Sequence, residues 1–108
     1  IYTGTHDNNT TRGWWKEASP ELRRNVCRYL GFESDDDKIA ANLTRLAWMS
    51  SSSLAITPLQ DLLNLEGNCR MNLPGTISGN WIWRCTARQF DALNPNLLRE
   101  WNEISGRA

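Results

Sequence analysis

Histidine and cysteine are scarce in this sequence of 108 residues, and long apolar runs are absent. It has one histidine and three cysteines, Cys27, Cys69 and Cys85, an odd set without C-x-x-C spacing. This set argues against a disulfide framework and against a zinc site, and it favours a reducing compartment. No apolar stretch approaches the roughly 20 residues of a membrane helix, and no segment resembles a secretory signal.

The chain also lacks net charge, because twelve basic residues balance twelve acidic ones. A neutral chain sets up no field that attracts nucleic acid or anionic lipid, so neither nucleic acid nor a membrane is an expected partner. The hydrophobic content of 40%, with six tryptophans, is enough for one packed core. Intrinsic disorder is therefore not expected.

Hydrophobic periodicity predicts a mainly helical chain with one or two short strands. Apolar and β-branched runs predict strands over residues 1–5 and 54–57, the second followed by a loop or a short helix. Turn-forming residues predict loops over 6–13 and 66–85. Helices are expected over 20–30, 38–51 and 86–92, with a last one starting at Asn94–Pro95.

This order of elements is typical of βα units with parallel strands, such as those of a barrel. Two strands cannot close a sheet, and an eight-stranded βα barrel needs about 250 residues. The sequence also begins with Ile1 rather than with methionine. We therefore expect the chain to be a piece of a larger protein.

The only histidine, His6, precedes Asp7 in "GTHDNN", directly after the first predicted strand. At the carboxyl end of a barrel strand, side chains point into the mouth where substrate binds. A carboxylate there can stabilise positive charge that develops on a sugar ring, while an imidazole donates to ring hydroxyls. The alternative is an ordinary loop with a capping aspartate and a surface histidine. A metal-dependent His-Asp phosphohydrolase is rejected, because that class needs further histidine ligands.

A second candidate stretch is "RMNLPGTISGNWIWR", in the longer predicted loop. Asn72 suits hydroxyl recognition, because its amide both donates and accepts hydrogen bonds. Pro74, followed by a glycine, fixes an unusual backbone. Trp81 and Trp83 alternate as residues on one strand face do, and a tryptophan face can stack on a sugar. The alternative is that the six tryptophans of the chain belong to a core or an interface.

Three stretches, "YTGTHDNNTTRGWW", "PLQDLL" and "RMNLPGTISGNWIWR", carry a family resemblance. They resemble the carboxyl-terminal part of the 4-alpha-glucanotransferases, the amylomaltases or disproportionating enzymes of glycoside hydrolase family 77 in the alpha-amylase superfamily. The resemblance implies that residues 1–108 supply the last two βα units of an eight-stranded TIM barrel, as a single segment and not a complete domain. It also implies that the substrate is maltooligosaccharide or starch-derived glucan. A glucan segment would pass, with retention, to the 4-hydroxyl of glucose or another glucan.

The resemblance assigns roles residue by residue. Asp7 matches a carboxylate that stabilises the oxocarbenium-like transition state, and His6 matches a sugar-binding histidine. Asn72 matches a residue of the sugar subsites, and Pro74 and Trp81 are expected to bind substrate with it. No cofactor is implied. The expected location is the cytoplasm, or the plastid stroma in a plant.

Two positions depart from the family pattern. Asn9 stands where the family more often has aspartate, so a charge is lost there. Glu66 stands where the family more often has the second glycine of Gly-Leu-Gly, so the loop near Asn72 is expected to differ locally. Neither position is expected to touch Asp7.

The nucleophile and the acid/base residue of such an enzyme lie on segments that this chain does not match. We therefore expect these 108 residues alone not to catalyse transfer. One alternative function is a glucan-binding module that stacks sugars on tryptophan. Another is a structural domain that self-associates through unpaired strand edges and apolar surface.

Overall fold

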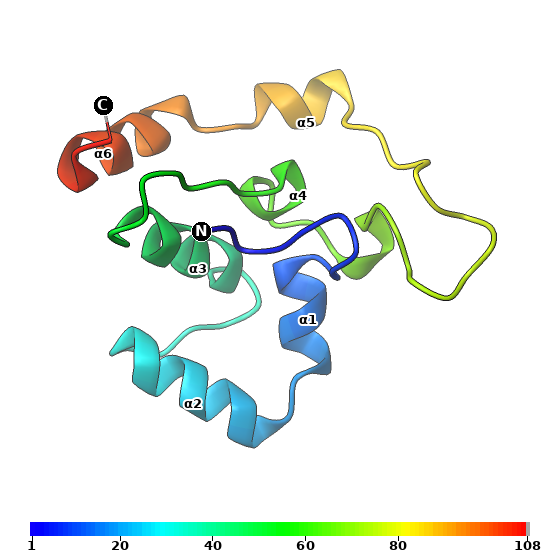
Figure 1. Cartoon of the computed structure of the whole chain (residues 1–108), viewed down its shortest axis with the longest axis horizontal. Helices are drawn as coiled ribbons and strands as arrows, with labels where there is room; N and C mark the ends of the chain where they lie inside the picture. The colour runs from blue at the N-terminus through cyan, green and yellow to red at the C-terminus, as the bar shows by residue number, and fades with distance from the viewer. Residues whose placement is uncertain (108) are drawn as a thin grey trace.

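The structure, a computed structural model, describes residues 1–107 as a chain of short helices (Figure 1). Helix α3 contacts α1, α4 and α6, so it lies at the centre of the fold. The predicted mainly helical class is confirmed. The elements in chain order are α1 (Thr11–Glu17), α2 (Pro20–Leu30), α3 (Ile39–Trp48), α4 (Leu59–Leu62), the 3₁₀ helix η1 (Gly67–Cys69), α5 (Ala87–Asp91) and α6 (Pro95–Ser105).

Local capping signals set the ends of several helices. In α2, Ser19 Oγ accepts a hydrogen bond from Leu22 N at 3.1 Å, and Gly31 ends the helix at φ +87°. A glycine adopts this left-handed conformation without a Cβ clash. In α6, Asn94 Oδ1 accepts from the backbone of the first turn. The helix predicted over 20–30 and the predicted start of the last helix are confirmed, and α5 occupies the helix expected over 86–92.

Helix α1 corrects the loop predicted over 6–13, because it begins inside that range at Thr11. The Thr10 hydroxyl accepts a hydrogen bond from Gly13 N at 3.1 Å and so caps the first turn. Threonine and glycine have low helix propensity, so the local sequence favours a loop. Burial of Trp15 in the core stabilises the helix in spite of that preference.

Helix α3 corrects a second boundary, because it ends at Trp48 rather than near residue 51. Arg107, far along the chain, donates from Nε to the Trp48 carbonyl at 2.8 Å. Its terminal nitrogens donate to the carbonyls of Ser52 at 2.7 Å and Ser50 at 3.0 Å. A distant side chain thus satisfies the carbonyl of the last helical residue and two carbonyls of the turn that follows it.

The two predicted strands are wrong as strands, although their segments do pair. Within residues 1–107 the structure has one parallel bridge, between Tyr2 and Ile56, and no extended ladder. Ile56 N donates to the Ile1 carbonyl at 3.0 Å. Pro58 lacks an N–H and cannot extend the pairing, and a pair of short segments without further strands has little stability of its own.

The core forms where α1, α2 and α3 meet. Trp15, Cys27 and Ile39 are buried together, one from each of these helices. On the other side of α3, the rings of Trp48 and Trp101 lie 6.4 Å apart and pack α6 against α3. The expectation that some tryptophans serve as core is therefore confirmed for Trp15 and Trp101, which are both buried.

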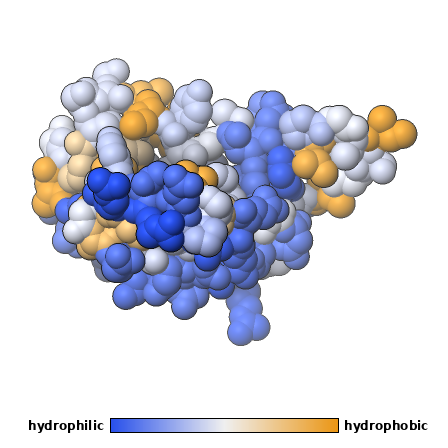
Figure 2. Space-filling model, turned by 90° about the horizontal axis from the view of Figure 1, so that it is seen from below, coloured by the Kyte–Doolittle hydropathy of each residue, from blue (hydrophilic) through white to orange (hydrophobic). Residues whose placement is uncertain are grey.

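The segment between η1 and α5 projects from this helical body (Figure 1) and forms the pointed lobe on the right of Figure 2. Ile77 and Ile82 are exposed there. Residues 66–85 contain only the 3₁₀ turn, as predicted for a loop. The expectation that Trp81 and Trp83 share a strand face is wrong, because Trp81 has a left-handed φ of +62° and no strand passes through this described segment. Within residues 1–107, no helix has the length and apolar character to cross a membrane.

Candidate active site

Residues predicted from two distant stretches meet at one place. Asn72 N donates to the His6 carbonyl at 3.1 Å, and Asn72 Nδ2 donates to Asp7 Oδ1 at 2.7 Å. His6 Nε2 lies 3.4 Å from the same carboxylate oxygen. The structure therefore brings three of the predicted site residues into direct contact across 65 residues of sequence.

Asp7 sits in a turn that Asn8 closes. Asn8 N donates to the Thr5 carbonyl at 3.1 Å, and Asn8 Oδ1 accepts from Thr5 N at 2.7 Å. Asp7 N donates to Thr5 Oγ1 at 3.3 Å. Asparagine and threonine favour such turns because their side chains replace backbone partners. The turn leaves the Asp7 side chain 51% exposed, so its carboxylate is open to a ligand.

Arg70 joins the two stretches and was not among the residues predicted from the sequence. One terminal nitrogen donates to the Asp7 carbonyl at 2.8 Å, and Nε donates to the Asn72 carbonyl at 3.0 Å. A planar guanidinium can make both bonds at once, whereas an ammonium group has no such fork. The available signal was its place two residues before Asn72 in the same motif.

Trp81 lies against His6 rather than in the core. The ring centroids are 4.9 Å apart with an interplanar angle of 40°. Trp81 N donates to the Met71 carbonyl at 2.6 Å, and this bond brings the end of the projecting loop back beside its beginning. The left-handed φ of a bulky residue costs energy and persists only where surrounding contacts hold it. With the side chain exposed, Trp81 borders the His6–Asp7 turn.

Pro74 is the predicted site residue that stays outside these contacts. It occupies a turn in which Thr76 N donates to the Leu73 carbonyl at 3.2 Å and Gly75 has φ +84°. Proline followed by a left-handed glycine is the sequence that a type II turn requires. Asn80 Oδ1 accepts from Leu73 N at 2.8 Å and closes the loop. Pro74 therefore shapes the loop backbone and makes none of the bonds that join His6, Asp7 and Asn72.

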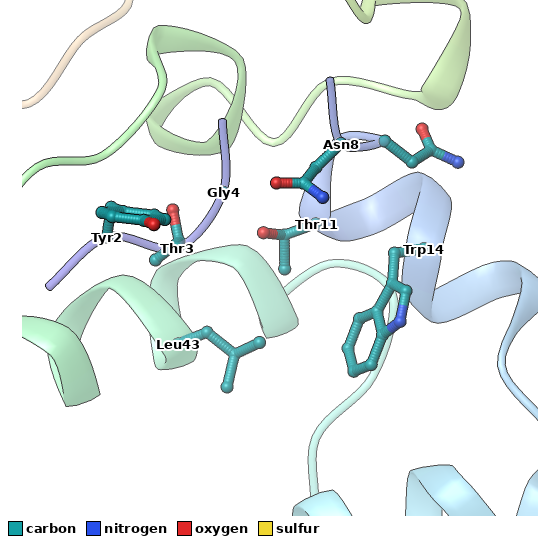
Figure 3. A pocket seen from close by; sticks show the side chains of 8 residues that line it. Tyr2, Thr3, Gly4, Asn8, Thr11, Trp14 and Leu43 are labelled. Atoms are coloured by element: carbon teal, nitrogen blue, oxygen red, sulfur yellow. The ribbon is translucent and has the colours of Figure 1, made fainter. Parts of the chain in front are cut away.

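Two open cavities flank the His6–Asp7 turn. One, of about 300 Å³, lies between the amino-terminal segment, α1 and α3, with Tyr2, Asn8, Trp14 and Leu43 in its lining (Figure 3). The other, of about 320 Å³, has His6, Gln60 and Arg70 in its lining. Both are lined by Gly4, Asn8 and Asn9, so the segment that carries His6 and Asp7 lies between the two cavities.

Asn9 is packed between two glycines. A Cβ at Gly13 would lie 2.5 Å from Asn9 Oδ1, and one at Gly67 would lie 2.8 Å from the same atom. A side chain at either glycine would therefore displace the Asn9 amide. Among the described residues, Asn9 Oδ1 is buried without a hydrogen-bond partner. Uncharged asparagine suits that environment better than aspartate, whose second oxygen would also need a partner.

Glu66 makes an ion-pair cluster with α1. Lys16 Nζ donates to Glu66 Oε1 at 2.6 Å, and Arg12 Nε lies 3.2 Å from the same oxygen. The hydrogen bond from Lys16, assisted by the charges of Arg12 and Lys16, lowers the pKa of Glu66 below its ordinary value of 4.5. Glu66, the residue before η1, therefore connects this loop to α1, and its described ion pairs are with Lys16 and Arg12 rather than near Asp7.

The chemistry available at the turn is that of a partly exposed carboxylate held by an amide and flanked by an imidazole. Within the described residues Asp7 Oδ2 accepts no hydrogen bond, so it is free to interact with a hydroxyl or a developing cation. Burial raises the pKa of the nearby Cys69 thiol, which argues against a thiolate nucleophile. Among residues 1–107, no three His, Cys, Asp or Glu side chains cluster as metal ligands do.

Comparison with known proteins gives one consistent result. The family model described as 4-alpha-glucanotransferase matches residues 1–89. A 4-alpha-glucanotransferase of Synechocystis is 48% identical over 94% of this chain, and the chloroplastic/amyloplastic one of Solanum tuberosum is 43% identical over 87%. An amylomaltase from Streptococcus agalactiae, solved in complex with acarbose, superimposes with a TM-score of 0.88 at 30% identity over 97% of this chain.

The chain spans only part of these proteins: 18% of the Synechocystis relative, 16% of the Solanum relative and 21% of the Streptococcus structure. The chain is therefore a fragment, about a fifth as long as these relatives. The resemblance inferred from the three sequence motifs is confirmed, because the family model covers all of them. The chain belongs to the 4-alpha-glucanotransferase family.

Proposed function

We propose that the protein carrying this chain is a 4-alpha-glucanotransferase. It moves an alpha-1,4-glucan segment from maltooligosaccharide or starch-derived glucan to the 4-hydroxyl of glucose or another glucan, with retention. Family membership supports the reaction class. The observation that carries the assignment to this site is the 2.7 Å bond from Asn72 to Asp7, which unites the two most distinctive motifs.

Each predicted site residue has a role that its geometry supports. Asp7 stabilises the oxocarbenium-like transition state, because an oriented carboxylate acts on positive charge as it develops. His6 and Asn72 flank Asp7 and donate to sugar hydroxyls. Trp81 borders the sugar-binding surface, and Pro74 shapes the loop that carries Asn72.

These residues supply only part of a retaining glycosidase site. Such a site needs a nucleophilic carboxylate and an acid/base carboxylate about 5.5 Å apart. Among the described residues, the side-chain partners of the Asp7 carboxylate are His6 and Asn72, and neither is a carboxylate. We infer that the chain forms the last two βα units of a TIM barrel, that other segments supply both groups, and that the 108 residues alone are inactive.

A chimera tests the proposal. The corresponding segment of the Synechocystis relative is replaced by this chain, and release of glucose and longer oligomers from maltotriose is measured. The chimera should be active, and the Asp7→Asn variant should lose about a hundredfold or more in kcat. The matched control is Asp91→Asn, on the exposed end of α5, which should retain full activity. An inactive chimera, an active Asp7→Asn variant, or turnover by the 108 residues alone contradicts the proposal.

Two other functions have an observation in their favour. Trp81 is exposed and lies beside the turn, which suits a glucan-binding module; a saturable change in tryptophan fluorescence with maltotriose in the 108-residue chain would favour it. Ile1, Tyr2 and Ile56 are exposed apolar residues at the paired segments, which suits self-association. Light scattering that shows only monomer would contradict self-association.

The names of the plant relatives bear on the cellular location of the protein. Those of Solanum tuberosum, Arabidopsis thaliana and Oryza sativa are named as chloroplastic/amyloplastic. These names support the plastid stroma if the source is a plant, and for any other source we propose the cytoplasm. Fractionation of source cells followed by immunodetection checks this assignment.

A further inference from the structure

Asp61, on α4, is a buried carboxylate held by three short hydrogen bonds. Its side chain accepts from Thr3 Oγ1 at 2.8 Å, from Thr11 Oγ1 at 2.7 Å and from Thr11 N at 2.8 Å. The residue is 3% exposed and is the one carboxylate among residues 1–107 that is buried. A buried anion is unfavourable unless donors surround it, so these bonds constrain where their donors lie.

The three donors come from the two ends of the turn that carries the site. Thr3 lies just before residues 4–10, and Thr11 lies just after them, at the start of α1. Figure 3 shows Thr3 and Thr11 on the two segments that border the cavity. One carboxylate therefore holds together both ends of the stretch that contains His6 and Asp7. Asp61 contacts neither of these residues itself.

The surrounding hydroxyls have only one consistent orientation. Each threonine has one hydroxyl proton, and that of Thr3 is donated to Asp61. In the 3.2 Å pair between Thr3 and Thr57, the proton must therefore come from Thr57. In the 3.3 Å pair between Thr57 and the fully buried Thr44, it must come from Thr44. Thr57 and Thr44 thus donate toward Thr3, and neither of them bonds to Asp61 itself.

We propose that Asp61 is a positioning residue for Asp7: by holding Thr3 and Thr11 at one point, it fixes the span of the 4–10 turn and hence the place of the Asp7 carboxylate. The effect on transfer rests on the proposed function of the site. A displacement of about 1 Å at a catalytic group can cost about a hundredfold in rate. Loss of Asp61 should therefore reduce the rate of the chemical step more than it weakens substrate binding.

Kinetics in the Synechocystis chimera test this role. Asp61→Asn replaces the accepting carboxylate, and Thr11→Val removes the Thr11 hydroxyl donor. If these two variants fold poorly, the milder Thr3→Val removes only the bond from Thr3 to Asp61. Each should lower kcat by about tenfold or more with KM nearly unchanged. The matched control is Thr44→Val, which removes a buried hydroxyl of the same hydrogen-bond chain that does not touch either end of the turn. It should lower the melting temperature and leave kcat unchanged.

A second readout is independent of activity. The chain has one histidine, so the 108-residue chain gives a single set of imidazole NMR signals, and His6 lies 4.9 Å from the Trp81 ring, close enough for a ring-current shift. That shift should be lost or displaced in Asp61→Asn and kept in Thr44→Val. An inactive parent chimera would refute the proposed function. The positioning role of Asp61 would then be tested by the imidazole signals alone. Unchanged kcat and signals in Asp61→Asn, or equal kcat losses in Asp61→Asn and Thr44→Val, would overturn the inference.

Discussion

Replacing Arg70 by lysine is the most direct test of how the two motifs are held together. The guanidinium donates to the Asp7 carbonyl at 2.8 Å and to the Asn72 carbonyl at 3.0 Å. A lysine ammonium keeps the charge, but it cannot present two parallel N–H groups to both carbonyls. Arg70→Lys should therefore keep one bond and lose the other, while Arg70→Ala loses both.

The size of the effect follows from the bonds lost. Arg70 is partly buried, so each bond contributes about 1 kcal/mol rather than the larger amount found for buried charged donors. Losing one bond lowers the ratio of correctly held to displaced turn about fivefold, and losing two lowers that ratio about thirtyfold. The expected order of activity is parent, then Arg70→Lys, then Arg70→Ala.

The assay is the initial rate of glucose release from maltotriose in the Synechocystis chimera, with kcat and KM determined separately. Arg84→Lys is the matched control, because Arg84 is exposed in the same loop and, in the described part of the chain, donates no side-chain hydrogen bond. Arg84→Lys should match the parent. If Arg70→Lys and Arg70→Ala also match the parent, Arg70 does not hold Asp7 and Asn72 in place and the reasoning fails.

Two further predictions concern stability. Arg107→Ala removes three bonds to the carbonyls of residues 48, 50 and 52, and it should lower the free energy of unfolding by about 2 kcal/mol in urea titrations, against an unchanged Arg99→Ala control. Glu66→Gln should lower the melting temperature at neutral pH, because the pKa of Glu66 is depressed by Lys16 in the folded state. A depressed pKa stabilises the fold above the ordinary value of 4.5, so the difference from E66Q should shrink as pH falls through the folded-state pKa. A difference that persists at about pH 2 would contradict it.

The helices that sequence reasoning placed well are those with local signals at their ends. Ser19 caps the start of α2 and Gly31 caps its end, and Asn94 caps the start of α6 in the same way. Where the controlling contact is distant, the prediction failed. Helix α3 ends at Trp48, whose carbonyl Arg107 binds, and α1 forms because Trp15 is buried.

The two predicted strands also failed because local sequence does not predict distant contacts. Their residues are β-branched and apolar, so propensity favours extended structure. Backbone pairing, however, needs a neighbour, and within residues 1–107 the two segments share only the Tyr2–Ile56 bridge. The parallel direction of this bridge agrees with the βα pattern, while the expected strands did not form.

The sequence by itself determined the family and the identity of His6, Asp7 and Asn72 as candidate residues, because long motifs retain residue types in order. Only the tertiary structure decided that Asp7 and Asn72 share a hydrogen bond, that Arg70 bridges their backbones and that Asp61 gathers both ends of the turn. Contacts between residues 50 or more positions apart depend on how whole helices pack. Local propensity does not predict that packing.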